Sequence, residues 1–229
     1  MDHHKGVSVW ADVEGFDNEY TFGRRPTGIY IPRYRNLNGD RRDYLRGFGF
    51  QGGAYREGWG RGQGDAIGAE LKEALSSPGS WKLSFNGFGE CLPYADNRAV
   101  LNTSLKDNWG RNSLTMEVTF RGNEQRMQAD MESSLAEMLE TCGYKGVKTS
   151  RVMSFPGNAN HEMGAARMGR DPRTSVLNGF NQMHEVPNVF ITDGSCMTSS
   201  ACVNPSLTYM ALTARACDYA VKELNKLSL

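Results

Sequence analysis

The chain has 229 residues, with 26 basic and 26 acidic side chains and therefore no formal net charge, which gives no electrostatic case for nucleic-acid binding. Its length allows one large or two small domains with a buried core, and no apolar run reaches membrane-spanning length. Five cysteines without a Cys-x-x-Cys pair argue for reduced thiols and against a disulfide framework or a zinc site (Cys91, Cys142, Cys196, Cys202 and Cys217).

The first part of the chain favours strands. Residues 6–16 and 28–34 are rich in β-branched and aromatic side chains, and Pro32 places the second segment at a sheet edge or a strand end. The adjacent His3 and His4 invite a metal interpretation, but neighbouring side chains in a strand point to opposite faces and no third ligand is in view. We therefore predict no metal site.

Residues 47–52, Gly-Phe-Gly-Phe-Gln-Gly, match the spacing of the Gly-x-Gly-x-x-Gly dinucleotide fingerprint. That fingerprint works only where a strand turns into a helix, and the Gly-rich residues 53–60 cannot open a helix. We predict instead a Gly- and aromatic-rich strand or loop over a substrate cavity. Tyr55 and Trp59 there would either stack on a sugar ring or pack within the protein.

The middle of the chain alternates helices and strands. Apolar spacing predicts helices over 66–76, stopped by Pro78, and over 123–142, ended by Gly143. The methionine-rich stripe of the second helix is typical of a core rather than of a cofactor site. Period-two patterns predict strands over 81–88, 99–102 and 114–120, and a strand or loop over 145–155.

The last part of the chain reads as a strand, a loop and a helix. Val189 to Thr192 predict a short buried strand that ends at Asp193 and Gly194. Asn204 is a good N-cap and Pro205 suits the first helical position. The following helix carries one apolar stripe that needs a packing partner (Leu207, Met210, Ala211, Ala214, Cys217, Val221 and Leu224). Such a corner suits an anionic ligand or a cofactor that becomes anionic.

Several sequence segments occur here in a specific order. They are His-Glu-Met-Gly-Ala-Ala-Arg-Met-Gly at 161–169, Asp-Pro at 171–172, Ser-Val at 175–176, Val-Pro-Asn-Val-Phe at 186–190 with Asp-Gly-Ser at 193–195, and Val-Asn-Pro-Ser-Leu-Thr at 203–208. Together they resemble the C-terminal signature of the glucose-methanol-choline (GMC) flavoprotein oxidoreductases. The resemblance covers roughly the last third of the chain.

The resemblance implies FAD-dependent oxidation of an alcohol, with hydride passing to the flavin. It implies that His161 faces the flavin and takes the hydroxyl proton, and that Asn204 hydrogen-bonds the same oxygen. It further implies that Asp193 and Gly194 form the cofactor-contacting turn and that Asn204 and Pro205 form the helix start beneath the flavin ring. An imidazole, with an unperturbed pKa of about 6.5, suits proton removal at neutral pH, and an amide can donate to a developing alkoxide.

The predicted fold class is α+β. We expect a mixed, mainly antiparallel sheet with flanking helices over residues 1–160, which would form a substrate-binding domain. Residues 161–229 would then complete the active site, with the terminal strand, loop and helix belonging to the FAD-binding domain.

The family's Gly-rich FAD fingerprint belongs to an N-terminal half that this sequence does not contain. We therefore expect the isolated chain to hold FAD weakly or not at all, and to need that region as a partner in cis or in trans. A truncated coding sequence, a piece of a longer polypeptide and a natural split protein are the three explanations. No signal peptide is present, so the default compartment is the cytoplasm, although a full-length protein could be exported.

The expected substrate is a small alcohol, most like those of the sugar and polyol branch because position 204 is Asn rather than His. Steroid, choline and simple alcohol substrates stay open, as does the choice between oxidase and dehydrogenase. The alternative function is a non-catalytic module that keeps the domain's fold and binds a substrate or a partner without turnover.

Overall fold

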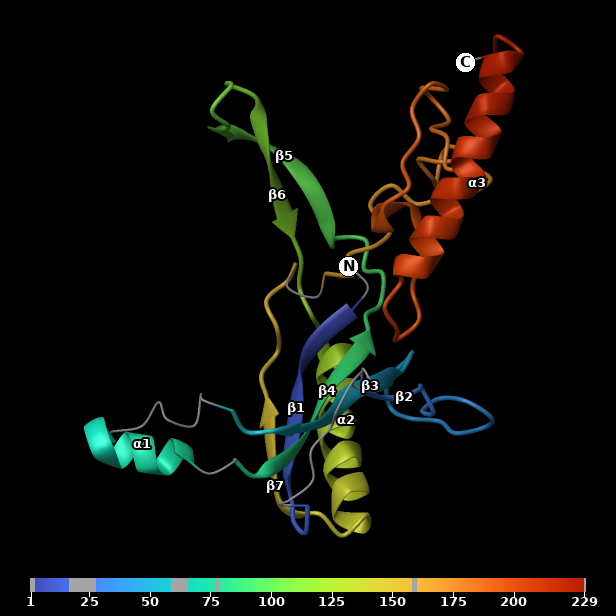
Figure 1. Ribbon diagram of the computed structural model, residues 1–229. Coiled ribbons are helices and arrows are strands. Elements are labelled where there is room, and N and C mark those ends of the chain that lie inside the picture. Colours follow the sequence, from blue (N-terminus) through green and yellow to red (C-terminus); the bar gives the residue numbers. More distant parts are fainter. Residues whose placement is uncertain (1–2, 17–27, 59–65, 77–78, 158–159, 229) are drawn as a thin grey trace.

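The computed structural model describes residues 3–16, 28–58, 66–76, 79–157 and 160–228 (Figure 1). The strands are β1 (His3–Val13), β2 (Ile29–Ile31), β3 (Phe48–Arg56), β4 (Trp81–Glu90), β5 (Arg98–Lys106), β6 (Asn112–Glu117) and β7 (Lys145–Arg151). The helices are α1 (Gly68–Ser76), α2 (Gly122–Thr141), the 3-10 turn η2 (Gly194–Cys196) and α3 (Ser206–Asn225). A five-stranded antiparallel sheet has the order β2-β3-β4-β1-β7, and β5 pairs with β6 in a separate hairpin. The α+β prediction is confirmed.

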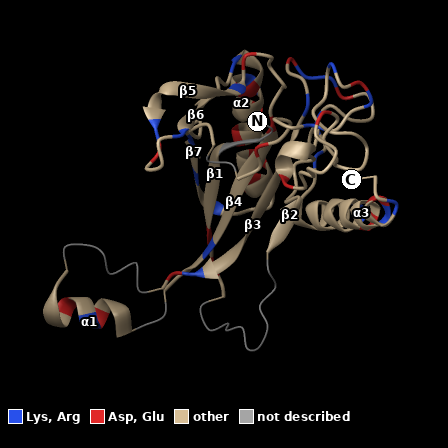
Figure 2. Cartoon of the chain, turned by 90° about the horizontal axis from the view of Figure 1, so that it is seen from above, with Lys and Arg blue, Asp and Glu red and all other residues tan. Residues whose placement is uncertain are grey.

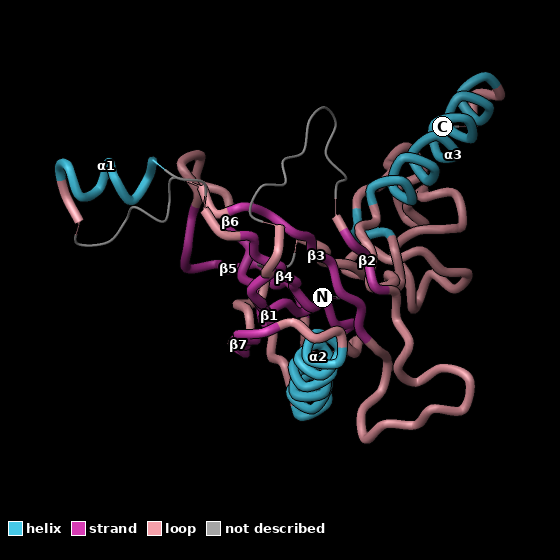
Figure 3. Tube along the Cα trace, turned by 60° about the horizontal axis from the view of Figure 1, so that its bottom comes forward, coloured by secondary structure: helices cyan, strands magenta, loops and turns pink. Residues whose placement is uncertain are grey.

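One face of the sheet is apolar and is covered by α2 (Figure 3). Alternate residues of β1, β3 and β4 point to this face and meet one stripe of α2 (Val7, Val9, Ala11, Phe48, Phe50, Leu83, Phe85, Met127, Met131, Leu135 and Leu139). Gly87 allows the close approach, because a Cβ there would lie 2.0 Å from the sulfur of Met131. The methionine stripe is therefore core, as predicted.

Polar contacts fix the start of α2. The buried carboxylate of Glu124 accepts from the backbone N–H of Arg121 at 2.9 Å and of Leu92 at 3.1 Å, and from the hydroxyl of Tyr94 at 3.0 Å. Burial opposes ionisation, but these hydrogen bonds outweigh it and lower the pKa of Glu124. The helix start is thereby joined to the segment that follows β4.

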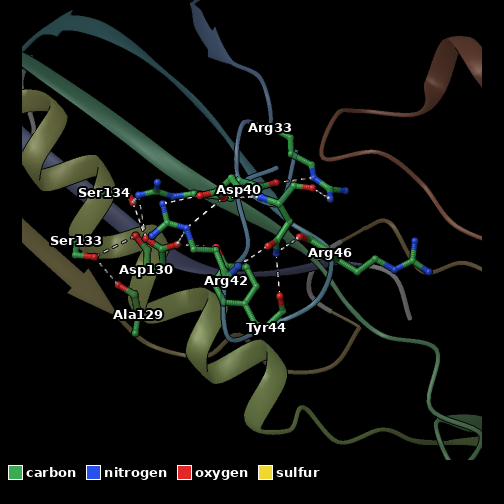
Figure 4. A network of polar contacts seen from close by, with 11 residues as sticks. Arg33, Asp40, Arg42, Tyr44, Arg46, Ala129, Asp130, Ser133 and Ser134 are labelled. Atoms are coloured by element: carbon green, nitrogen blue, oxygen red, sulfur yellow. Dashed lines mark hydrogen bonds and ion pairs between the residues drawn. The ribbon is translucent and has the colours of Figure 1, made fainter. Parts of the chain in front are cut away.

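The loop between β2 and β3 is held on α2 by a second polar network (Figure 4). Asp130 accepts from the hydroxyl of Tyr44 at 2.6 Å and pairs with Arg35 at 3.2 Å, and Arg35 also donates to Ser134 at 2.7 Å. At the other end of the loop, the buried Glu90 pairs with Arg46 at 2.9 Å. These contacts place β2 and β3 firmly beside the core, and none of the described helices covers the opposite face of the sheet.

Residues 48–52 lie in β3 and Gly47 directly precedes it, so the segment is not a strand-to-helix turn, which confirms the rejection of the dinucleotide fingerprint. Trp59, the other aromatic residue predicted to border a cavity, lies outside the described residues. The helix predicted over 66–76 is present as α1, and the strands predicted before residue 160 are present with shifted ends. In the part of the chain that the structure describes, no helix combines the length and apolar character needed to cross a membrane.

The prediction of a buried strand over Val189 to Thr192 is wrong. Only Phe190 makes a strand-like contact, an isolated bridge with Gln182, and Val189 is 38% exposed. Apolar, β-branched residues form a strand when a neighbouring strand takes up their backbone hydrogen bonds. Here the only neighbour among the described residues is the short segment 181–183. The N–H of Met183 donates to Val189 at 2.9 Å and that of Ile191 donates to Asn181 at 3.0 Å, so the pairing stops at one bridge and does not extend into a sheet.

Candidate active site

The run from His161 to Gly169 packs against the turn η2. The backbone N–H of Ala166 donates to the carbonyl of Ser195 at 3.0 Å, and that of Met168 donates to Cys196 at 2.8 Å. Residues 161–169 and 193–196, which are separated by more than twenty residues of the signature, are therefore neighbours in space.

Gly194 sits where η2, the 161–169 run and α3 meet. A Cβ on Gly194 would lie 2.6 Å from the hydroxyl of Tyr209, in the first turn of α3, and 3.0 Å from the carbonyl oxygen of Glu162. Only a glycine leaves room for this approach. Beside it, Asp193 accepts from the N–H of Ser195 at 2.9 Å and so caps η2.

The start of α3 differs by one residue from the prediction. Pro205, and not Asn204, is the N-cap, and the carbonyl of Pro205 accepts from the N–H of Tyr209 at 3.0 Å. The side chain of Asn204 is directed toward the sheet instead, where its amide nitrogen donates to the side chain of Gln51 at 3.3 Å. No side chain caps the helix, so the N–H groups of its first turn point out of its end.

Asn204 borders an open hollow of about 750 Å³ on the face of the sheet opposite α2. β2, β3 and β4 form its floor, and Tyr55, one of the two aromatic residues for which the sequence left sugar stacking open, is among the lining residues. None of the described residues that line it carries a charge, and in Figure 2 the charged residues gather on loops, helices and strand ends rather than on the middle of β3 and β4. The hollow is therefore suited to a neutral polar ligand.

The loop that carries Asn204 is tied to the sheet by three side-chain contacts. The hydroxyl of Tyr30 donates to the carbonyl of Cys202 at 3.1 Å, the thiol of Cys202 donates to the carbonyl of Gly47 at 3.3 Å, and Asn204 donates to Gln51. The position of the predicted catalytic amide is thus set by β2 and β3.

His161 lies in different surroundings from Asn204. It is half-buried at the start of the run that packs on η2, and it is not among the residues that line the hollow. Next to it, one carboxylate oxygen of Glu162 is buried and finds no hydrogen-bond partner among the described residues. An unpartnered buried acceptor is costly unless a bound group supplies a donor.

Sequence reasoning missed Gln51, Tyr30 and Glu162. Gln51 follows Phe50, which faces the core, so strand alternation places Gln51 on the opposite face. That signal was available in the sequence. The contact of Gln51 with Asn204 was not, because it joins segments that are far apart along the chain.

The GMC oxidoreductase family model matches residues 93–213. The chain is 30% identical over 162 residues to the fructose dehydrogenase large subunit of Gluconobacter japonicus, a match that covers 70% of this chain and 29% of that protein. It is 33% identical over 132 residues to 2-methyl-1,2-propanediol dehydrogenase of Mycolicibacterium austroafricanum, covering 58% and 24%. It is 28% identical over 153 residues to the gluconate 2-dehydrogenase flavoprotein of Pantoea cypripedii, covering 64% and 25%.

Among solved structures, pyridoxine 4-oxidase from Mesorbium loti aligns with a TM-score of 0.41 at 16% identity, over 98% of this chain and 44% of that one. The matches to the three dehydrogenases span only about a quarter of those proteins' own length. Because the family model covers more than half of its 229 residues, the chain belongs to the GMC oxidoreductase family.

Proposed function

We propose that this chain is the substrate-binding and active-site part of an FAD-dependent oxidoreductase that oxidises the CH–OH group of a sugar or polyol. The observation that carries the proposal is the placement of Asn204, whose amide borders an uncharged hollow and is oriented by Gln51. Two of the relatives are named for a sugar or a polyol, fructose dehydrogenase and 2-methyl-1,2-propanediol dehydrogenase. Residues 1–160 would supply the substrate domain and 161–229 the completing segment.

Two features support a fit between these residues and FAD. The uncapped first turn of α3, with Asn204 and Pro205 before it, offers backbone N–H groups to negative charge. Gly194, which follows Asp193, lies close to the hydroxyl of Tyr209 in that turn. The unpartnered oxygen of Glu162 would accept an N–H or O–H of the bound group. FAD, when bound, accepts the hydride from the carbinol carbon. The nucleotide-binding region of the family would hold the rest of the cofactor, in cis or in trans.

The chain's own residues would handle the proton. His161 would take the proton from the substrate hydroxyl onto its imidazole, which raises electron density on the carbinol oxygen as the C–H bond weakens. Asn204 has two N–H bonds, of which one is committed to Gln51. The other would donate to the same oxygen, so that base and donor act together on one atom.

The test uses the chain assembled with a GMC FAD-binding region and follows dye reduction with D-fructose and other polyols. We expect His161→Ala to lower kcat by roughly 10²–10⁴-fold and Asn204→Ala by roughly 10²–10³-fold, with flavin still bound. His184→Ala is the matched control, because His184 contacts Ser175 at 3.1 Å within the 171–184 loop. An assembled protein that binds flavin and sugar but turns over no alcohol would favour the non-catalytic binding module.

A further inference from the structure

A row of polar residues crosses all five strands of the main sheet. The register pairs Tyr30 of β2 with Gln51 of β3, Gln51 with Asn86 of β4, Asn86 with Ser8 of β1, and Ser8 with Ser150 of β7. Residues in register on neighbouring strands project to the same face. Their sequence neighbours, such as Phe50 and Phe85, belong to the core, so this cross-strand row lies on the open face, where the hollow is.

The amides at the centre of the cross-strand row are already oriented. The hydroxyl of Ser8 donates to the oxygen Oδ1 of Asn86 at 2.7 Å, and the amide of Asn204 donates to the oxygen Oε1 of Gln51 at 3.3 Å. Each amide oxygen is therefore engaged. The amide nitrogens of Gln51 and Asn86 make no hydrogen bond to any described residue, and both residues line the hollow.

This pattern has a chemical meaning. Two fixed carboxamides with engaged oxygens present N–H donors and no charge, so they suit acceptors such as hydroxyl and ring oxygens. Adjacent strands lie about 4.8 Å apart, so Gln51 reaches an oxygen close to Asn204 and Asn86 reaches one farther along the ligand. A small diol held at Asn204 would contact Gln51 alone, whereas a six-carbon chain or ring would contact both.

We propose that Gln51 and Asn86 are specificity-determining residues that bind two hydroxyl or ring oxygens of a neutral hexose or hexitol beside the reacting carbinol. Ser8 is a positioning residue that holds the amide of Asn86 in its donating orientation. The inference rests on the proposed function, since it takes Asn204 as the point where the reacting alcohol is held. A carboxylate substrate fits less well, because no described lining residue supplies a positive charge.

The kinetic test compares D-sorbitol, D-gluconate and 2-methyl-1,2-propanediol on the assembled flavoprotein. Asn86→Asp keeps the shape of the side chain and replaces its N–H donor by an acceptor. KM for D-sorbitol therefore rises roughly tenfold, while kcat for D-sorbitol and KM for 2-methyl-1,2-propanediol are unaffected. Ser8→Ala raises the same KM about threefold, since it frees the amide without removing it. The control is Asn112→Asp, which makes the same change in β6, away from the hollow, and leaves KM and kcat for all three substrates unchanged.

A binding test separates this inference from the proposed function. The ¹⁵N-labelled 229-residue chain is titrated with D-sorbitol, and the side-chain amide signals of Gln51 and Asn86 are followed by NMR. Saturable shifts of both signals in wild type, together with weaker D-sorbitol binding at the Gln51 signal in Asn86→Asp, support the inference, even if the assembled protein oxidises no alcohol and the proposed function fails. Unshifted signals together with the same KM in wild type and Asn86→Asp overturn it, even if His161→Ala abolishes turnover.

Discussion

The sheet with α2 and the segment from 161 onward are packed in different ways. α2 buries an apolar stripe and a polar N-terminal cluster against the sheet, whereas among the described residues of α3 only Ala216 is buried. Leu207 and Met210 on α3 are 79% and 68% exposed. The sheet half has its own core. The C-terminal segment is held by hydrogen bonds to the sheet and within its own loops, by single buried side chains such as Leu177, and by the stacking of Phe180 on Tyr219 of α3. The apolar stripe of α3 finds no cover in the described chain.

The largest expected effect is on the core of the sheet half. Leu135 is fully buried between α2 and the strands, so Leu135→Ala removes apolar contacts and leaves a cavity. We expect it to lower the free energy of unfolding by about 2–5 kcal/mol. Urea denaturation followed by circular dichroism measures this. A loss under 1 kcal/mol would show that the sheet and α2 do not form one cooperative core.

The next effect concerns the polar cluster at the start of α2. Glu124→Gln replaces a carboxylate that accepts from Arg121, Leu92 and Tyr94, and we expect a loss of about 1–3 kcal/mol at pH 7. Because the folded-state pKa of Glu124 is lowered, the stabilisation is present above its unfolded pKa of about 4.3 and disappears as pH falls through the folded value.

The stabilities of wild type and Glu124→Gln should therefore draw together as the pH falls below about 4.3 and through the lowered folded-state pKa of Glu124. Denaturation at several pH values checks this. A difference that stays constant from pH 7 to pH 3 would contradict the assigned role of the charge.

A smaller effect is expected where α3 holds the loops. Arg215 donates to the fully buried side chain of Asn181 at 3.2 Å, and Asn181 in turn donates to the carbonyl of Ile191 at 2.9 Å. Arg215→Met should cost about 1 kcal/mol and speed hydrogen exchange in residues 181–191. Lys222→Met, on the same helix but paired only with Asp218 among described residues, serves as control and leaves exchange there unchanged.

The smallest effect should come from the exposed stripe. Leu207→Ala is the same substitution as Leu135→Ala, but Leu207 is solvent-exposed, so in the isolated chain we expect a change within about 0.5 kcal/mol. In the protein assembled with an FAD-binding region the cost should rise if that region covers the stripe. If Leu207→Ala costs equally little in the isolated chain and in the assembled protein, the FAD-binding region does not cover the stripe.

Elements with strong local patterns were predictable from the sequence. The spacing of Met127, Met131 and Leu135 predicts α2 almost to the residue, and Gly143 marks its end. The Gly-rich residues 53–60 correctly argued against a nucleotide-binding turn at β3. In each case the deciding interactions are local, or depend only on which face of an element is apolar.

The rest depended on contacts between distant segments. The segment predicted as a strand over 189–192 pairs, among the described residues, only with residues 181–183 and stops at a single bridge, and the side chain of Asn204 contacts Gln51 on β3 and does not cap α3. Neither outcome can be read from local propensity. His161 and Asn204 stay predicted catalytic residues: their supports are now defined, and their chemistry awaits the kinetic test.

The strand order has a consequence for biosynthesis. β1 is an interior strand, bonded to β4 on one side and to β7 on the other, and Val7 pairs with Arg151. Pairings between such distant residues cost loop-closure entropy before they return stabilisation, so they form slowly. Until the ribosome has translated as far as Arg151, the edge of β1 that will pair with β7 has no partner strand, and an unpaired edge of this kind favours edge-to-edge association with other chains.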